Sequence, residues 1–401
     1  MSLNAERSYK MKLRDVENAF KYRRIPYPKR SVELIALLAI SCTFFLFMHT
    51  NKLNSRLKEM EVKLQPSEFS ALGLTGNHIS GHDAGKHDDI NTLHGTYQYL
   101  KSTGQLGRVT ALHLNNTRFA GTEIVIFNRP TRVESEQMVP LFRQLAAMND
   151  INVVLNGPVR TMNRTRTEEE QIIESAWANE LERGSIYMAH SNWLDFASFG
   201  FKKPIYISLV KDPIERMITD FYRRRSWEKR AIHRRMYPGR QERPDEWYQQ
   251  SFNECVRSRS PECLFVQYAV ADYIQDFKRQ SLYFCGNEAD CLPFNSHHAT
   301  QLAKQRVEKE YSVVGTWEER NITLTVLEKY VPRFFNHARF LYKLHSKSIR
   351  NRNRNNRKPH VDADVREMVR RNFTNEYEFY YFCKQRLYKQ YLALQLENNL
   401  H

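Results

Sequence analysis

Common nucleotide and metal motifs are absent from this chain of 401 residues. Neither G-x-x-x-x-G-K-S/T nor G-x-G-x-x-G occurs, which excludes an ordinary P-loop nucleoside triphosphatase and an ordinary dinucleotide-binding domain. C-x2-C spacing is also absent and the histidines do not cluster, so we expect no metal site. A phosphate-binding loop in this chain must therefore be of another kind.

Acidic residues are fewer than basic ones, with 45 Asp and Glu against 61 Lys and Arg, which gives a net charge of +16. This excess favours polyanionic partners, namely nucleic acid, an anionic membrane, or a sulfated or carboxylated glycan. Composition alone does not choose among them. The length fits one α/β domain of roughly 250 to 300 residues with an anchored stem, and two average domains would also fit.

Long apolar runs are scarce, but one extends from Leu34 to Met48 and follows a basic leader. A helix of about 17 residues from Val32 rises about 26 Å, close to the thickness of an early-secretory membrane. The positive-inside rule predicts a cytosolic tail at 1–31, a signal anchor at 32–49 and a luminal remainder, which makes nucleic acid an unexpected partner. A buried core helix and a cleaved signal peptide are the alternatives, although no A-x-A cleavage site follows the run.

Cysteine is also scarce, with six residues in the chain. Cys255 with Cys263 and Cys285 with Cys291 are close in sequence, and we predict two small-loop disulfides, as in an oxidising lumen. Four free buried thiols are the alternative. N-x-S/T sequons permit luminal glycosylation, and all of them follow the apolar run, at Asn115, Asn163, Asn321 and Asn372.

The luminal part divides into a stem at 50–105 and a folded domain at 106–401. Residues 53–64 carry apolar side chains at helical spacing, which suggests a stem helix that can pair with a second copy, and 65–105 predict a flexible stalk. From residue 106 short β-branched runs alternate with amphipathic segments, which predicts a parallel sheet flanked by helices. The expected strands are 123–127, 151–155, 185–189, 204–210 and 311–315.

Two of these strands end in segments suited to anions, because ligands of open parallel sheets bind beyond the carboxyl ends of the strands. In EIVIFNRPTRVESEQMVPLFRQL a strand is followed by a loop from Asn128 to Ser135 and a helix that opens near Glu136. In PIYISLVKDPIERMITDFY a strand stops at Lys211, and the chain continues as a helix that contains Thr219.

Over nearly all of 120–385, these segments resemble the uronosyl 2-O-sulfotransferases, which modify heparan and dermatan or chondroitin sulfate. The resemblance implies a sulfotransferase fold and a donor, 3′-phosphoadenosine-5′-phosphosulfate (PAPS), whose sulfuryl group passes to the 2-hydroxyl of a uronic acid. The family's Y-N-R-V-P-K-T-A-S-T segment cradles the 5′-phosphosulfate, and here Arg132 takes the Lys place and Ser135 the Ser place. VKDPIER resembles the family's motif around the 3′-phosphate, which implies Lys211 and Thr219 for that group.

HSNWLDFASFG resembles the family's H-V-x-F-L-D-F-x-x-F-G and implies that His190 is the catalytic base. An imidazole near its operating pKa can take the hydroxyl proton, while a cation such as Arg132 stabilises the leaving phosphate. The stretch 341–358 is similar to the family's loop over the nucleotide, which implies donor contacts from Tyr342, Ser348 and Arg350. A solvated basic linker is the alternative for its Asn/Arg repeat.

By the same resemblance Arg129 and Arg243 hold the acceptor, an anionic glycan, and the cysteine pairs are the family's two disulfide loops. Basic residues between 221 and 243 can line an acceptor cleft, or they form a solvated helical face. Trp193 and Trp227 are predicted to be packing residues. We expect a single-pass type II protein of the Golgi membrane, whose stem helix permits a homo-oligomer.

Two other functions stay open. A Golgi glycosyltransferase commonly needs D-x-D, which occurs here only at Asp362 to Asp364, before an apparent helix where an N-cap role is expected. A non-catalytic relative is the other alternative. Glu134 and Glu136 lie in the phosphate loop, and their carboxylates repel an anionic donor unless they point outward or bind another cation.

Overall fold

The computed structural model describes residues 91–398, except 134, 156, 159–165, 266–278, 294 and 352–357, and it also describes Met48. The predicted cytosolic tail, the stem helix and, apart from Met48, the predicted membrane anchor lie outside these residues. Within the part of the chain that the structure describes, no helix is both long and apolar enough to cross a bilayer.

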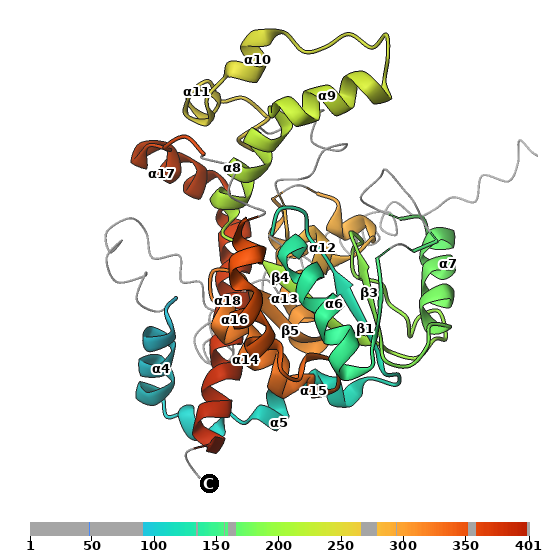
Figure 1. Cartoon of the computed structure of the whole chain (residues 1–401). Helices are drawn as coiled ribbons and strands as arrows, with labels where there is room; N and C mark the ends of the chain where they lie inside the picture. Colours follow the sequence, from blue (N-terminus) through green and yellow to red (C-terminus); the bar gives the residue numbers. More distant parts are fainter. Residues whose placement is uncertain are drawn as a thin grey trace, which may run out of the picture. The chain divides into compact units, whose positions relative to one another are not determined.

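A five-stranded parallel sheet in the order β2-β3-β1-β4-β5 forms the centre of the domain (Figure 1). The predicted parallel sheet and all its expected strands are confirmed, each within one residue at either end. Apart from β2, every strand is buried along its whole length, as in sheets covered by helices on both faces. The strands are β1 (Ile124–Asn128), β2 (Asn152–Val154), β3 (Ser185–Ala189), β4 (Ile205–Val210) and β5 (Tyr311–Thr316).

Helices flank the sheet (Figure 1). Aliphatic and aromatic side chains form the core between the layers. Phe142 of α6 contacts Phe127 of β1 and Phe335 of α15 edge to face, with ring centroids 5.7 and 5.5 Å apart. The helices are α4 (Leu93–Ser102), α5 (Ala111–Leu114), α6 (Met138–Asn149), α7 (Glu168–Asn179), α8 (Pro213–Arg224), α9 (Trp227–Met236), α10 (Asp245–Gln249), α11 (Phe252–Arg257), α12 (Leu282–Cys285), α13 (His297–Lys309), α14 (Arg320–Tyr330), α15 (Pro332–Phe335), α16 (Ala338–Asn351), α17 (Ala363–Asn372) and α18 (Thr374–Asn398).

Helix α4 lies in the region predicted to be a flexible stalk, so the prediction is wrong for residues 93–102. Thr92 caps the helix by accepting a hydrogen bond from the Gly95 amide at 3.0 Å, and Leu100 is buried. α4 packs on α18, and Gln385 of α18 donates to the Asn91 side chain at 2.9 Å. The folded domain therefore begins before residue 106.

Both predicted disulfides are present, and all four of their cysteines are buried. Cys255 of α11 is bonded to Cys263, and Cys285 at the end of α12 is bonded to Cys291. Cys383 on α18 is a buried free thiol, and burial raises its pKa.

Replacing Cys285 and Cys291 together by alanine should lower the free energy of unfolding by about 2 to 3 kcal/mol, because the loop closure no longer restricts the unfolded chain. Chemical denaturation of the oxidised parent and the double variant measures the difference. Recovery of both cysteines as free thiols from the secreted parent, by non-reducing peptide mapping, would refute this disulfide.

Candidate active site

Three neighbouring strands bring the predicted site residues to one edge of the sheet. β3, β1 and β4 are adjacent and parallel, so their carboxyl ends lie together. His190 follows β3, the loop with Arg129 and Arg132 follows β1, and Lys211 follows β4.

Side chains from other parts of the chain hold the backbone of the turn from β4 into α8. Lys211 is buried, and Gln280 bonds to both of its peptide groups, accepting from its amide at 3.1 Å and donating to its carbonyl at 2.8 Å. Asp212 caps α8 by accepting from the Glu215 amide at 3.1 Å, and its own amide donates to Glu318 at 3.0 Å. A rigid helix N-terminus preceded by a lysine is suited to a phosphate.

Thr219 lies two turns into α8 and meets a cation that the sequence analysis did not single out. Its hydroxyl donates to the Glu215 carbonyl at 2.6 Å and accepts from Lys358 Nζ at 2.5 Å. Lys358 is the last residue of the basic stretch 341–358, and its place in that stretch was the one indication in the sequence that it could bind the donor. The structure therefore brings this end of the stretch to α8.

His190 and Arg129 are in direct contact. His190 Nδ1 lies 2.8 Å from the Arg129 carbonyl, which can only accept, so Nδ1 carries the proton and Nε2 the lone pair. The Arg129 guanidinium donates to Nε2 at 3.2 Å. His190 is solvent-exposed at the edge of the site, yet desolvation by the surrounding protein and then the charge of Arg129 lower its pKa below the ordinary value of 6.5. The neutral ring is therefore favoured at physiological pH.

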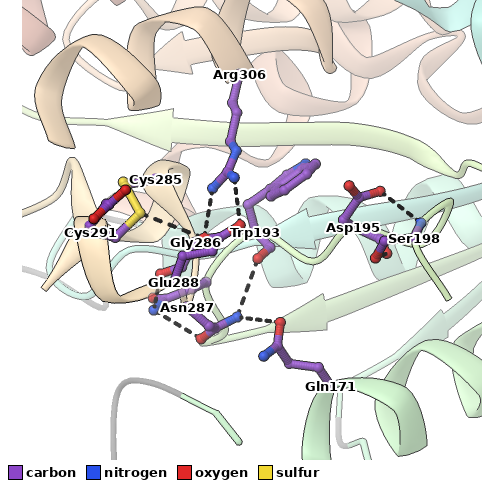
Figure 2. Close-up of polar contacts among 12 residues, drawn as sticks. Gln171, Trp193, Asp195, Ser198, Cys285, Gly286, Asn287, Glu288, Cys291 and Arg306 are labelled. Atoms are coloured by element: carbon purple, nitrogen blue, oxygen red, sulfur yellow. Dashed lines mark hydrogen bonds and ion pairs between the residues drawn. A yellow bond between two sulfur atoms is a disulfide. The ribbon is translucent and has the colours of Figure 1, made fainter. Parts of the chain in front are cut away.

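The segment after His190 is held by the Cys285–Cys291 loop (Figure 2). Asn192 donates to the Gly286 carbonyl at 3.0 Å, and Asn287 donates to the Trp193 carbonyl at 3.4 Å. Asn287 also accepts from the Asn192 amide group at 3.3 Å. A disulfide loop about a hundred residues away in sequence thus supports the candidate base, a role the sequence analysis did not foresee.

Trp193 is buried, as predicted, and its ring packs under the Arg306 guanidinium at 4.1 Å from the centroid. Arg306 is held by an ion pair with Glu288 of the disulfide loop at 2.6 Å, which Figure 2 also shows. Arg306 thus links the segment that follows His190 to the disulfide loop.

The other residues expected to bind PAPS lie on different elements of the fold. Ser135 is buried at the start of the short 3-10 helix Ser135–Gln137, and Tyr342 is buried on α16 with its hydroxyl accepting from Arg320 at 3.1 Å. Ser348 and Arg350 also belong to α16, but their side chains lie outside the described residues.

Of the two glutamates in the β1 loop, Glu134 lies outside the described residues and Glu136 is exposed. The carboxylate of Glu136 raises the pKa of both Arg129 and His190, although burial outweighs it in each case. Glu136 thus acts electrostatically on the candidate base and on Arg129.

The region predicted to hold the acceptor is helical and strongly basic. The Arg243 guanidinium lies 5.5 Å from the Trp247 ring centroid, and Arg230 and Arg234 form ion pairs with Glu242. Trp227 is 77% exposed at the start of α9, so its prediction as a packing residue is wrong. The helix is too polar to bury its first residue against the domain.

Asp362 stands at the N-cap position of α17, as predicted, but its side chain makes no capping bond within the described residues. Asp362 and Asp364 instead both pair with Arg257, at 2.6 and 3.0 Å. The charged guanidinium is a stronger partner than a backbone amide. The D-x-D segment thus joins α17 to α11.

Comparison with known proteins gives the family. A model of the sulfotransferase family matches residues 106–382. The Drosophila melanogaster protein named uronyl 2-sulfotransferase homolog pip is 45% identical, over 98% of this chain and 95% of the relative. Chicken heparan sulfate 2-O-sulfotransferase 1 is 27% identical over 65% of this chain and 69% of the relative. Human uronyl 2-sulfotransferase is 26% identical over 66% of this chain and 62% of the relative.

The family model covers most of the folded domain, and the Drosophila relative matches nearly the whole chain. The chain therefore belongs to the sulfotransferase family, in the group of the uronyl 2-sulfotransferases and their homologues.

Proposed function

We propose that the chain transfers a sulfuryl group from PAPS to the 2-hydroxyl of a uronic acid in a glycosaminoglycan or a related glycan. The observation that carries this proposal is the neutral His190, whose Nε2 lone pair faces Arg129 beside two anion-suited loops. The names of the relatives, which include uronyl and heparan sulfate 2-O-sulfotransferases, agree with the acceptor class.

The donor would lie across the ends of β1 and β4. Lys211, Thr219 and Lys358 would bind the 3′-phosphate, since two ammonium groups and a hydroxyl match a dianion. Arg132 and Ser135 would bind the 5′-phosphosulfate, and Tyr342, Ser348 and Arg350 would border the nucleotide. The family motifs support these roles, and so do the positions of the residues on α8, in the loop after β1 and on α16.

In the chemical step the acceptor hydroxyl would displace Arg129 from His190 Nε2 and give its proton to that atom. The hydroxyl oxygen attacks sulfur as the bond from sulfur to the bridging phosphate oxygen breaks, and that oxygen leaves with the electron pair. The charge of Arg132 stabilises the leaving phosphate. A neutral imidazole is required, which the lowered pKa of His190 provides.

The glycan would extend over Arg129 toward Arg243 and α9. None of the residues of α9, all of which the structure describes, is buried, and Trp227, Arg230, Arg234 and Arg235 line a shallow pocket on one face of the helix. An exposed indole offers a flat apolar surface for a sugar ring, and arginines pair with carboxylate and sulfate groups.

We also propose that residues 32–49 anchor the chain in the Golgi membrane, with 1–31 in the cytosol and 50–401 in the lumen. The stem would lie between the anchor and α4. The two disulfides fit an oxidising lumen. Self-association through the apolar positions of 53–64 belongs to the same proposal.

His190→Ala should abolish sulfuryl transfer while leaving the affinity for 3′-phosphoadenosine-5′-phosphate (PAP) nearly unchanged, because the base acts on the acceptor. Lys211→Ala should instead weaken PAP binding by roughly ten- to a hundredfold, since it removes a charge-assisted contact. Calorimetric titration and a sulfate-transfer assay measure the two effects.

The pH profile separates this role of His190 from a structural one. In the parent, kcat/KM should rise with pH through an apparent pKa below 6.5 and stay level above it, because the folded-state pKa is lowered and the neutral ring is the base. Full activity in His190→Ala would remove the proposed base. Absence of PAP binding in the parent would favour the non-catalytic alternative.

The sequons offer a test of luminal topology with internal controls. Asn321 is exposed on the first turn of α14, whereas the Asn372 side chain pairs with both backbone groups of Phe265, at 2.5 and 3.0 Å. Asn115 donates to the Tyr330 carbonyl at 3.4 Å, and Asn163 lies outside the described residues. A glycan on Nδ2 of Asn372 or Asn115 would have to fit beside the backbone that this nitrogen contacts in the folded chain.

Asn321→Gln should therefore remove one glycan, so that the variant is lighter than the parent before treatment with peptide N-glycosidase and equal to it afterwards. Asn372→Gln should remove none. Glycopeptide mapping of the secretory-pathway protein identifies the occupied sites. A fully glycosylated Asn372, or a protein without any glycan, would contradict the proposal.

A further inference from the structure

Helix α8 holds the loop after β1 through two residues one turn apart, Arg216 and Asp220. Arg216 is 1% exposed, and its Nε donates to the Thr131 carbonyl at 2.7 Å while Nη2 donates to the Thr131 hydroxyl at 3.3 Å. The next loop residue, Arg132, pairs through Nε with Asp220 Oδ1 at 2.8 Å. Residues four apart share a helix face, so α8 presents both partners to the loop together.

Asp220 is 4% exposed, and its second carboxylate oxygen lies 2.9 Å from Arg224 Nε. A buried carboxylate is costly unless it is paired, and here two guanidinium groups compensate it. Arg132 has a φ of +66°, a conformation that a residue with a side chain keeps only when its surroundings hold it. The ion pair to Asp220 is such a restraint.

The contact uses one particular nitrogen of Arg132. Nε is directed at Asp220, and among the described residues no hydrogen bond or ion pair involves the two terminal nitrogens of the guanidinium; the side chain is 20% exposed. Those two nitrogens can bind two oxygens of one phosphate or sulfate group. A lysine has a single nitrogen, which would have to serve both Asp220 and an anion.

Further cations surround Arg132. The pKa of Arg223 is lowered by burial and then by the charge of Arg132, and the pKa of Lys229 is lowered by burial, by Arg223 and by Arg132. Positive charges that disfavour one another in this way gain from an anion placed among them. This supports an anion at the terminal nitrogens of Arg132.

We propose that Asp220 is a positioning residue that fixes Arg132 through Nε, so that the terminal nitrogens of Arg132 bind the 5′-phosphosulfate of the donor. The inference rests on the proposed function, because it takes PAPS as the anion. It accounts for an arginine at the place where the family has a lysine. It also makes α8 the common support of both phosphate sites, since Thr219 is the neighbour of Asp220.

A double-mutant cycle tests the role: the parent, Arg132→Lys, Asp220→Ala and the double variant are compared for kcat/KM with PAPS and for the Kd of PAP. Each single change should lower kcat/KM about tenfold, and the double variant should be no worse than Asp220→Ala, because the advantage of arginine over lysine depends on Asp220. Asp220→Asn keeps an oxygen for Nε and should recover activity to within about threefold of the parent.

Asp364→Ala is the matched control, since it breaks an arginine–aspartate pair at the start of α17, and it should leave the PAP affinity and kcat/KM unchanged. Additive losses in the cycle would overturn the positioning role while the proposed function stands. The role would also fall if Asp220→Ala lowered only the melting temperature and left the PAP affinity unchanged. A parent that binds no PAP would overturn the proposed function and this role together.

Discussion

The buried guanidinium of Arg216 joins the two segments that face the donor site. It lies on α8, directly after the turn at Lys211, and it bonds to Thr131 in the loop after β1. Burial raises the pKa of Glu376 on α18, and the charge of Arg216 partly opposes that shift. Glu376 accepts from the Gln280 amide at 2.8 Å, and the Gln280 side chain in turn holds both peptide groups of Lys211. One buried polar network thus fixes the spacing of both anion sites, and in such a network each group depends on its partners.

The same arrangement sets the protonation of the candidate base. Cations gathered for an anionic donor also act on His190, and together with burial they keep its pKa low. Desolvation and the charge of Arg129 together favour the neutral imidazole. Glu136 works in the opposite direction, so its exposed position limits how far it offsets the surrounding arginines.

The sequence was sufficient to predict the strands, the disulfides and the segments at the site, because each has a local pattern of apolar, turn or cysteine residues. Contacts between distant residues had no such signal. Arg132 and Asp220 are 88 positions apart, and Lys358 meets Thr219 across 139. α4 was not predicted because its weak apolar pattern forms a helix face only in contact with α18. Trp227 was wrongly predicted to be a packing residue because residue type alone does not show whether an aromatic side chain at a helix start is buried.

We expect α8 and the turn before it to bind the 3′-phosphate of the donor. Calorimetric titration of the purified chain with PAP and with 5′-AMP, which lacks that phosphate, tests it most directly. The account predicts that PAP binds at least about a hundredfold more tightly, because several charge-assisted contacts are lost with the phosphate. Equal affinities for the two nucleotides, or no binding of PAP, would contradict it.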